Sequence, residues 1–214
     1  MITQFVTDRL FPLNCLGCDT EGSWVCGACE DALLFFPAVW QEGPAPLVGV
    51  TAVYTYDQPV AHAAIHVLKY QYAEGVMTWM APTIERWCRE GGAEMMPADA
   101  IIVPVPLHRK RYAERGFNQA ALIAAVLGRA LGRPVLPLLR RKRATTPQVA
   151  QTRLGRIQNV ADAFVIRSGS IPYFRPIIVV DDVTTTGATL AACARALMEH
   201  GATRVYGFAF AKEI

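Results

Sequence analysis

Apolar residues along this chain fall into two kinds of pattern. Short unbroken runs predict buried strands, and segments in which apolar residues recur every three or four positions predict amphipathic helices. The expected strands lie at 48–56, 100–103, 135–139, 164–166, 177–180 and 203–210. The expected helices lie at 62–70, 76–90, 118–131 and from 190 onward. Strands and helices that alternate in this way indicate an α/β protein.

One junction between a strand and a helix is rich in polar side chains. The strand at 177–180 runs into Asp181 and Asp182, and the small, hydroxylated stretch 184–189 leads into the next helix. Unpaired amides and the helix dipole attract an anion there, threonines add hydroxyl donors, and Gly187 lets the backbone approach a ligand. Carboxylates repel phosphate but suit sugar hydroxyls or a divalent cation. The junction therefore predicts a ribose 5-phosphate site, against the alternative of an ordinary turn with a chance Asp pair.

Basic residues are concentrated in the middle of the chain. The net charge is +3, yet residues 101–160 hold twelve Lys or Arg and one acidic residue, whereas residues 1–46 carry a net charge of −5. The strand at 100–103 ends in a cationic loop at 104–111, which we expect near the phosphate site because open α/β sheets bind ligands at the carboxyl ends of their strands. Lys69, at the end of another predicted helix, is a further cation that can reach an anionic ligand. Pyrophosphate and nucleic acid both suit so basic a region, and a solvated basic surface is the alternative.

Two Cys-x-x-Cys pairs near the start of the chain form a second candidate site, made of Cys15, Cys18, Cys26 and Cys29. Each short turn aims two thiolates at one point, which suits a structural tetrahedral Zn²⁺. Disulfides and an iron–sulfur cluster are the alternatives. The stretch 43–46, Gly-Pro-Ala-Pro, reads as a linker. We therefore expect a zinc-ribbon-like domain at 1–42 and a larger domain at 47–214.

Composition narrows the setting in which the chain works. Apolar residues make up 52% and charged residues 18% of the 214 positions, as in globular proteins. No apolar run approaches the length of a membrane span, and the first residues lack the features of a signal peptide. We therefore expect a cytoplasmic protein without membrane insertion. The number of chains in its assembly has no signal in the sequence.

The polar junction closely resembles the signature by which type I phosphoribosyltransferases bind 5-phosphoribosyl-1-pyrophosphate (PRPP). Together with the Cys pairs, Lys69-Tyr70, the run 103–119, and the stretch from Arg143-x-x-Thr-Pro-Gln148 to Arg156-x-x-Asn159, it resembles the ComF family over nearly the whole chain. That family includes competence protein F and GntX-like proteins. The resemblance implies a type I phosphoribosyltransferase fold with a mainly parallel central sheet, flanking helices and a zinc-ribbon-like N-terminus. It also implies a link to DNA uptake in natural transformation.

The resemblance assigns roles to particular residues. The residues implied to bind PRPP or ribose 5-phosphate are Asp181, Asp182, Val183, Thr184, Thr185, Thr186, Gly187, Ala188 and Thr189, with the two aspartates on the ribose hydroxyls. The residues implied to bind pyrophosphate, with Mg²⁺, are His108, Arg109, Lys110 and Arg111. The segment 140–160 corresponds to a flexible loop, in which Arg143, Gln148, Arg156 and Asn159 are candidates to contact the substrate or nucleic acid.

Two functions of different kinds fit these features. The first is an enzyme that transfers a phosphoribosyl group from PRPP to an acceptor, for which the sequence offers no general base and no base-recognition residues. The second is a binding module that holds single-stranded DNA or senses PRPP, with Tyr112 and Phe117 available for stacking. The DNA-uptake machinery is the expected partner in either case.

Overall fold

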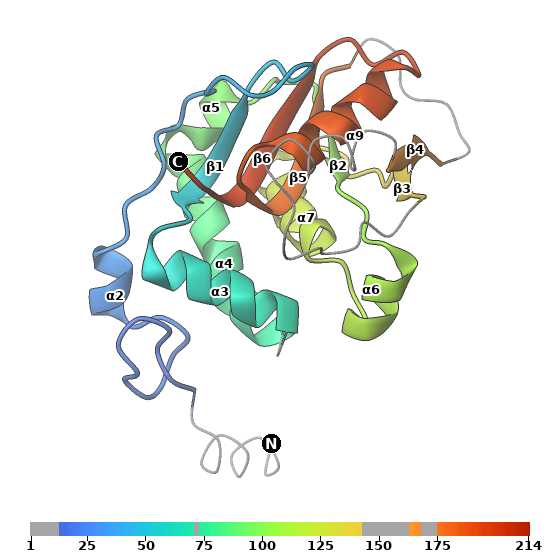
Figure 1. Cartoon of the computed structure of the whole chain (residues 1–214). Coiled ribbons are helices and arrows are strands. Elements are labelled where there is room, and N and C mark those ends of the chain that lie inside the picture. The colour runs from blue at the N-terminus through green and yellow to red at the C-terminus, as the bar shows by residue number, and fades with distance from the viewer. Residues whose placement is uncertain (1–12, 71–72, 143–162, 168–174) are drawn as a thin grey trace.

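The computed structural model describes residues 13–70, 73–142, 163–167 and 175–214. The central sheet consists of β1 (Val50–Thr55), β2 (Ile101–Pro104), β5 (Ile177–Thr184) and β6 (Val205–Lys212). These strands lie in the order β1-β6-β5-β2, and each neighbouring pair is parallel. Helices α3 (Pro59–Tyr70), α4 (Ala73–Trp87) and α7 (Gln119–Leu131) cover one face, and α9 (Ala188–Met198) covers the other (Figure 1). The predicted α/β fold with a parallel central sheet and flanking helices is confirmed.

The smaller elements lie around this sheet. They are α2 (Gly27–Asp31), a π-helical turn (Cys88–Gly92), α5 (Ala93–Met95), α6 (Arg109–Arg115) and a separate antiparallel pair, β3 (Leu139–Arg141) with β4 (Phe164–Ile166). Among the described residues, every helix is too short or too polar to cross a bilayer.

The central strands are mainly apolar because both of their faces are covered. Along β5, Ile178 and Val180 belong to the core under α3, α4 and α7. Ile177 and Val179 belong to the core under α9. Successive strand residues point to opposite faces, so a strand buried on both sides shows no polar alternation. The unbroken apolar runs therefore predicted the central strands correctly.

The N-terminal segment packs on the same side of the molecule as α3 and α4. Val25 is buried in the core that these helices share. The ring of Trp24 lies against Gly75 of α4, where an added Cβ would be 2.6 Å from the ring. Further along, Phe36 donates its amide to the carbonyl of Val53 in β1, and Pro44 lies beside Gly187 in the turn before α9. The cysteine-bearing segment is thus held against α3 and α4 by packing.

Three predicted boundaries near the expected ligand site were wrong. The strand expected at 135–139 is instead β3 at 139–141, and Val135 makes only an isolated bridge to Ile102. The basic stretch from Arg109 is helix α6 rather than loop, because His108 caps its start and Gly116 ends it in the left-handed region. The strand expected to stop at 180 continues to Thr184, because β6 remains beside it as a hydrogen-bonding partner.

Candidate functional site: a polar pocket at the end of the sheet and a four-cysteine cluster

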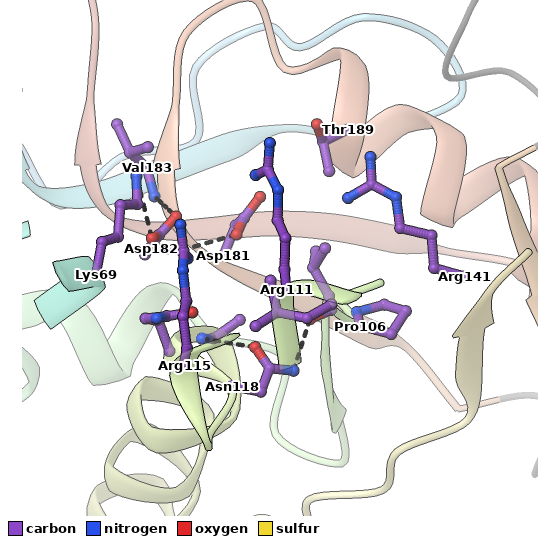
Figure 2. Close-up of a pocket in the computed structure, with 14 residues that line it drawn as sticks. Lys69, Pro106, Arg111, Arg115, Asn118, Arg141, Asp181, Asp182, Val183 and Thr189 are labelled. Carbon is purple, nitrogen blue, oxygen red and sulfur yellow. Dashed lines mark hydrogen bonds and ion pairs between the residues drawn. The ribbon is translucent and has the colours of Figure 1, made fainter. Parts of the chain in front are cut away.

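A polar pocket of about 220 Å³ lies where β2 ends and β5 continues. The pairing of β2 with β5 ends at Pro104 and Val180, whereas β5 runs on through Asp181 and Asp182. That side of β5 is therefore open, and the pocket forms beside it (Figure 2). The lining residues include Lys69, Arg111, Arg115, Asn118, Gln119, Arg141, Asp181, Asp182, Val183 and Thr189. A volume below the usual 300–1,000 Å³ of sites for drug-sized ligands suits a compact polar ligand.

The two adjacent aspartates face different neighbours. Asp182 accepts an ion pair from Nζ of Lys69 at 3.2 Å, and its carboxylate also accepts a hydrogen bond from the amide of Val183. Asp181 accepts a hydrogen bond from the amide of Asp182. Burial, and next the neighbouring carboxylate of Asp182, raise the pKa of Asp181 well above its usual range. The pair therefore offers one carboxylate held by a lysine and a second carboxyl whose pKa is raised by burial and by its neighbour.

Three arginines bring positive charge to the same pocket. Arg111 and Arg115 lie at positions i and i+4 of α6, so they share one face of that helix. Arg141 comes from β3, and in Figure 2 both Arg111 and Arg141 extend toward Thr189 of α9. Burial, and then the charge of Arg111, lower the pKa of Arg141. A compact anion placed between these guanidinium groups and the start of α9 would be attracted by both.

The first turn of α7 completes the wall opposite α9. Asn118 caps this helix as predicted, because its side chain accepts the amide of Ala120. The same side chain donates to the carbonyl of Val105 at 2.9 Å, which ties the loop after β2 to the helix. Gln119 is buried and donates to the carbonyl of Leu68 in α3. These hydrogen bonds hold the loop after β2, the start of α7 and the end of α3 together around the pocket.

The predicted site residues divide into those that line the pocket and those that do not. Of the motif residues, Asp181, Asp182, Val183 and Thr189 line it, as do the predicted cations Lys69 and Arg111. The residues placed outside its lining are Thr184, Thr185, Thr186, Gly187, Ala188, His108, Arg109 and Lys110. Arg109 and Lys110 are exposed on α6. Arg143, Gln148, Arg156 and Asn159 lie outside the described residues.

Sequence reasoning missed Arg115, Gln119 and the individual role of Arg141. The i, i+4 spacing of Arg111 and Arg115 was a usable signal, but it has meaning only once the stretch is known to be helical. Arg141 was one of several basic residues in a segment expected to be a flexible loop, and β3 singles it out. Gln119 carried no signal because its burial depends on α3.

The four cysteines of the N-terminal segment form a compact group, the four-cysteine cluster. Their sulfur atoms all lie within 4.8 Å of one another, and the Sγ atoms of Cys18 and Cys26 are 3.6 Å apart. All four are free thiols rather than disulfides. Burial raises the pKa of Cys15, but hydrogen bonds from the amides of Cys26 and Gly17 outweigh it, so the pKa falls to about 6. This group can hold a metal ion.

Comparisons with known proteins place the chain in a family. It is 35% identical to competence protein F of Haemophilus influenzae over 52% of this chain and 49% of the relative. It is 34% identical to competence protein ComFC of Bacillus subtilis over 47% and 39%, respectively. These two matches span about half or less of the relatives' length. The chain is also 30% identical to DNA utilization protein YhgH of Escherichia coli K12 over 93% of this chain and 82% of the relative.

The fold and the two sites define an α/β protein with a polar pocket lined by cations and carboxyls and with a cysteine cluster. By its sequence this chain belongs to the ComF family, as its motifs indicated. No protein-family model matches it. Among solved structures, it resembles PRPP amidotransferase of Bacillus subtilis at 16% identity, with a TM-score of 0.44 over 67% of this chain and 30% of that one. It also resembles an adenine phosphoribosyltransferase at 20% identity, with a TM-score of 0.40 over 66% and 71%.

Proposed function

We propose that the pocket binds the ribose 5-phosphate unit of PRPP and that the protein transfers this phosphoribosyl group to an acceptor during DNA uptake. One observation carries the proposal: two carboxyls, a helix start with Thr189, and four cationic side chains meet in a single compact pocket. Sugar hydroxyls, a phosphate and a pyrophosphate are the groups that those three features respectively attract. PRPP carries all three.

The arginines would act on the leaving group. In the transfer, the bond from ribose C1 to the pyrophosphate oxygen breaks and the electron pair leaves with pyrophosphate. The acceptor forms the new bond to C1 and gives up its proton to water or to the departing pyrophosphate. Positive charge develops on the ribose and negative charge on the departing oxygen. Arg111, Arg115 and Arg141 would supply fixed charge for that oxygen without reorganisation, and electrostatic stabilisation of this kind is usually the largest single contribution to catalysis.

The residues present also fit Mg²⁺ carried by the substrate. Apart from the four-cysteine cluster, no group of three potential metal-ligating residues stands together in the described part of the chain. Mg²⁺ commonly binds through one or two carboxylates plus substrate phosphates, and Asp181 and Asp182 are the carboxylates at hand. When bound, the ion would neutralise charge on the pyrophosphate.

Two neighbouring cations on α6 give a direct test of the pocket. Arg111 lines the pocket and Lys110 does not. Arg111→Ala should therefore weaken PRPP binding about tenfold or more, which is the effect of losing one charge-assisted hydrogen bond. Lys110→Ala should leave PRPP binding nearly unchanged. Isothermal calorimetry with PRPP and Mg²⁺ measures both affinities, and pyrophosphate release measures turnover. Equal losses in the two variants would mean that α6 contributes only a general positive field.

A second function has its own support. The exposed side chains of Tyr70 and Tyr112 stand on the two helices that supply cations to the pocket. Aromatic rings beside cations are typical of surfaces that bind single-stranded nucleic acid. A binding module for single-stranded DNA, or a PRPP sensor, would use the same pocket without catalysis. Pyrophosphate release in the presence of candidate acceptors separates this function from the enzyme.

We further propose that the four-cysteine cluster binds one structural Zn²⁺. Zinc ligated by thiolates at about 2.3 Å in a tetrahedron separates the sulfur atoms by about 3.8 Å. The Cys18–Cys26 separation of 3.6 Å is close to this value. Four thiolates leave no open coordination position, so the role is to stabilise the segment that packs on α3 and α4.

Removal of this metal should loosen the N-terminal segment more than the rest of the chain. Elemental analysis of protein purified without chelator should give about one zinc per chain, and Cys26→Ser should lose it. Hydrogen exchange should then rise mainly within residues 13–40. Cys88→Ser alters a buried thiol outside the cluster and serves as the control, since it should retain the metal. Metal-free protein with unchanged exchange in this segment would contradict the proposal.

A further inference from the structure

Lys69 approaches the carboxyls of the pocket from the end of α3. Its Nζ atom lies 3.2 Å from Oδ2 of Asp182, and in Figure 2 this pair lies on the other side of Asp181 from Thr189 and Arg141. A phosphate is attracted to the start of α9, where Thr189 lies, so Lys69 lies away from that position. The charge of Lys69 is therefore directed at a carboxylate.

The carboxylate of Asp182 is held at both of its oxygens. Oδ1 accepts the amide of Val183 at 2.8 Å, and Oδ2 lies beside Nζ of Lys69. A carboxylate has about four acceptor positions, so these contacts leave positions for the hydroxyl groups of a ligand. The side chain of Asp182 is only 11% exposed, so water gives it little other support. Loss of the lysine would free Oδ2 and leave a nearly buried negative charge without this partner.

Two residues of the pocket wall hold the chain on either side of Lys69. Gln119, which is buried, donates to the carbonyl of Leu68 at 3.4 Å. Arg115 places its guanidinium carbon 5.3 Å from the ring centre of Tyr70. The end of α3 is thus tied to the segment that carries α6 and α7. An ammonium group that starts from such a held backbone is suited to fix the position of another side chain.

We propose that Lys69 is a positioning residue: its ion pair orients the carboxylate of Asp182 so that the remaining acceptor positions face the ribose hydroxyls, and it does not contact the phosphates. This inference deepens the proposed function by assigning Lys69 to recognition of the sugar, and it rests on that function. A lysine suits this task because its ammonium group is a compact point charge. The cations of the pocket then have two tasks. Lys69 acts through a carboxylate, and Arg111, Arg115 and Arg141 act on the anion.

The test compares ribose 5-phosphate with inorganic phosphate, which share the anion but not the sugar. Calorimetry without Mg²⁺ gives the ratio of the two affinities for the parent, Lys69→Met, Asp182→Asn and the variant with both changes. An effect of the lysine's charge on the anion changes both affinities and cancels in the ratio. Lys69→Met should lower the ratio about fivefold, the contribution of one ordinary hydrogen bond. The double variant should lower it no further than Asp182→Asn alone, because the lysine then has no carboxylate to position.

Two further variants test whether the position of the charge matters. Lys69→Arg keeps the charge and should keep most of the ratio, which a general effect on packing would not predict. Lys110→Met removes a lysine that is exposed on α6 outside the pocket lining, and it should leave the ratio unchanged. Thermal melting shows whether the lone carboxylate unfolds Lys69→Met. In that case the comparison of Asp182→Asn with the double variant, which has no lone carboxylate, still decides the question.

The outcomes separate this inference from the proposed function. A parent-like ratio in Lys69→Met would overturn the inference, because Lys69 would then act on the phosphate or only on the fold. A double variant whose loss is the sum of the two single losses would also overturn it. Both results would leave the proposed function standing, since the parent would still prefer ribose 5-phosphate. A parent that binds ribose 5-phosphate no better than phosphate would overturn the proposed function, and the role of Lys69 with it.

Discussion

Replacement of Asp182 by alanine should weaken the binding of ribose 5-phosphate at least about tenfold. The residue is nearly buried beside the pocket, and its carboxylate is held by Lys69 at 3.2 Å. A hydrogen bond to a charged group contributes roughly 1.5–3 kcal/mol, and a tenfold change corresponds to about 1.4 kcal/mol. Asp182→Asn keeps the shape and an acceptor for the amide of Val183 but removes the charge, so its loss should be smaller than that of the alanine variant.

The same substitution should leave the fold almost unchanged. The part of β5 before the aspartates stays packed under helices on both faces, and Lys69 retains the carboxyl of Asp181 as a neighbour. Calorimetry with ribose 5-phosphate and thermal melting together test this expectation. Glu90→Ala is the matched control, because it also breaks an ion pair, with Arg86, and neither residue lines the pocket. Parent-like affinity in Asp182→Ala would remove the aspartate pair from ribose recognition.

Replacement of Gly187 by valine should damage both ligand binding and stability. Gly187 has a φ of 74°, in the left-handed region, where a residue with a side chain costs roughly 1–2 kcal/mol. An added Cβ would also lie 2.7 Å from Cδ of Pro44. Relief of that contact must move either the linker or the start of α9. We expect the melting temperature to fall by several degrees and ribose 5-phosphate binding to weaken about tenfold or more, as for loss of one charge-assisted hydrogen bond.

Two further variants separate the effect of the positive φ at Gly187 from the effect of crowding against Pro44. Gly132 ends α7 with a φ of 63° and has no heavy atom within 4 Å of an added Cβ. Gly132→Val should therefore lower the melting temperature without weakening ribose 5-phosphate binding. Pro44→Ala removes the ring that an added Cβ would strike, so it should restore part of the affinity lost in Gly187→Val. If that double variant binds no better than Gly187→Val, then the Pro44 contact does not constrain the turn before α9.

The contact of Pro44 with Gly187 also shows how far the sequence could lead. The stretch 43–46 was predicted as a linker between domains because of its composition, and nothing in that pattern indicates what it touches. The structure lays it against the turn between β5 and α9. The motif itself indicated that position 187 favours a glycine. No feature of the sequence indicated that Pro44, from a distant part of the chain, would lie against it.

Helix α6 illustrates a different kind of failure. Its sequence, Arg-Lys-Arg-Tyr-Ala-Glu-Arg, has no apolar stripe, so hydrophobic periodicity could not predict it. The helix forms between a cap at His108 and a left-handed glycine at Gly116. Because the stretch was expected to be a loop, Arg109, Lys110 and Arg111 were treated as equivalent. The helical turn makes them different, since only Arg111 of the three lines the pocket.

The sequence alone determined those features that depend on neighbours along the chain. Strands buried on both faces had to be unbroken apolar runs, so the run at 177–180 indicated both β5 and the parallel sheet in which such strands occur. Close spacing likewise indicated the aspartate pair, the four-cysteine cluster and the cap at Asn118. Tertiary structure decided which distant residues meet: Lys69 with Asp182, Arg115 with Tyr70, and Arg141 with the end of β5. Such meetings depend on the lengths and packing of whole elements. The aspartates of β5 reach the pocket only because β2 stops pairing with β5 at Pro104.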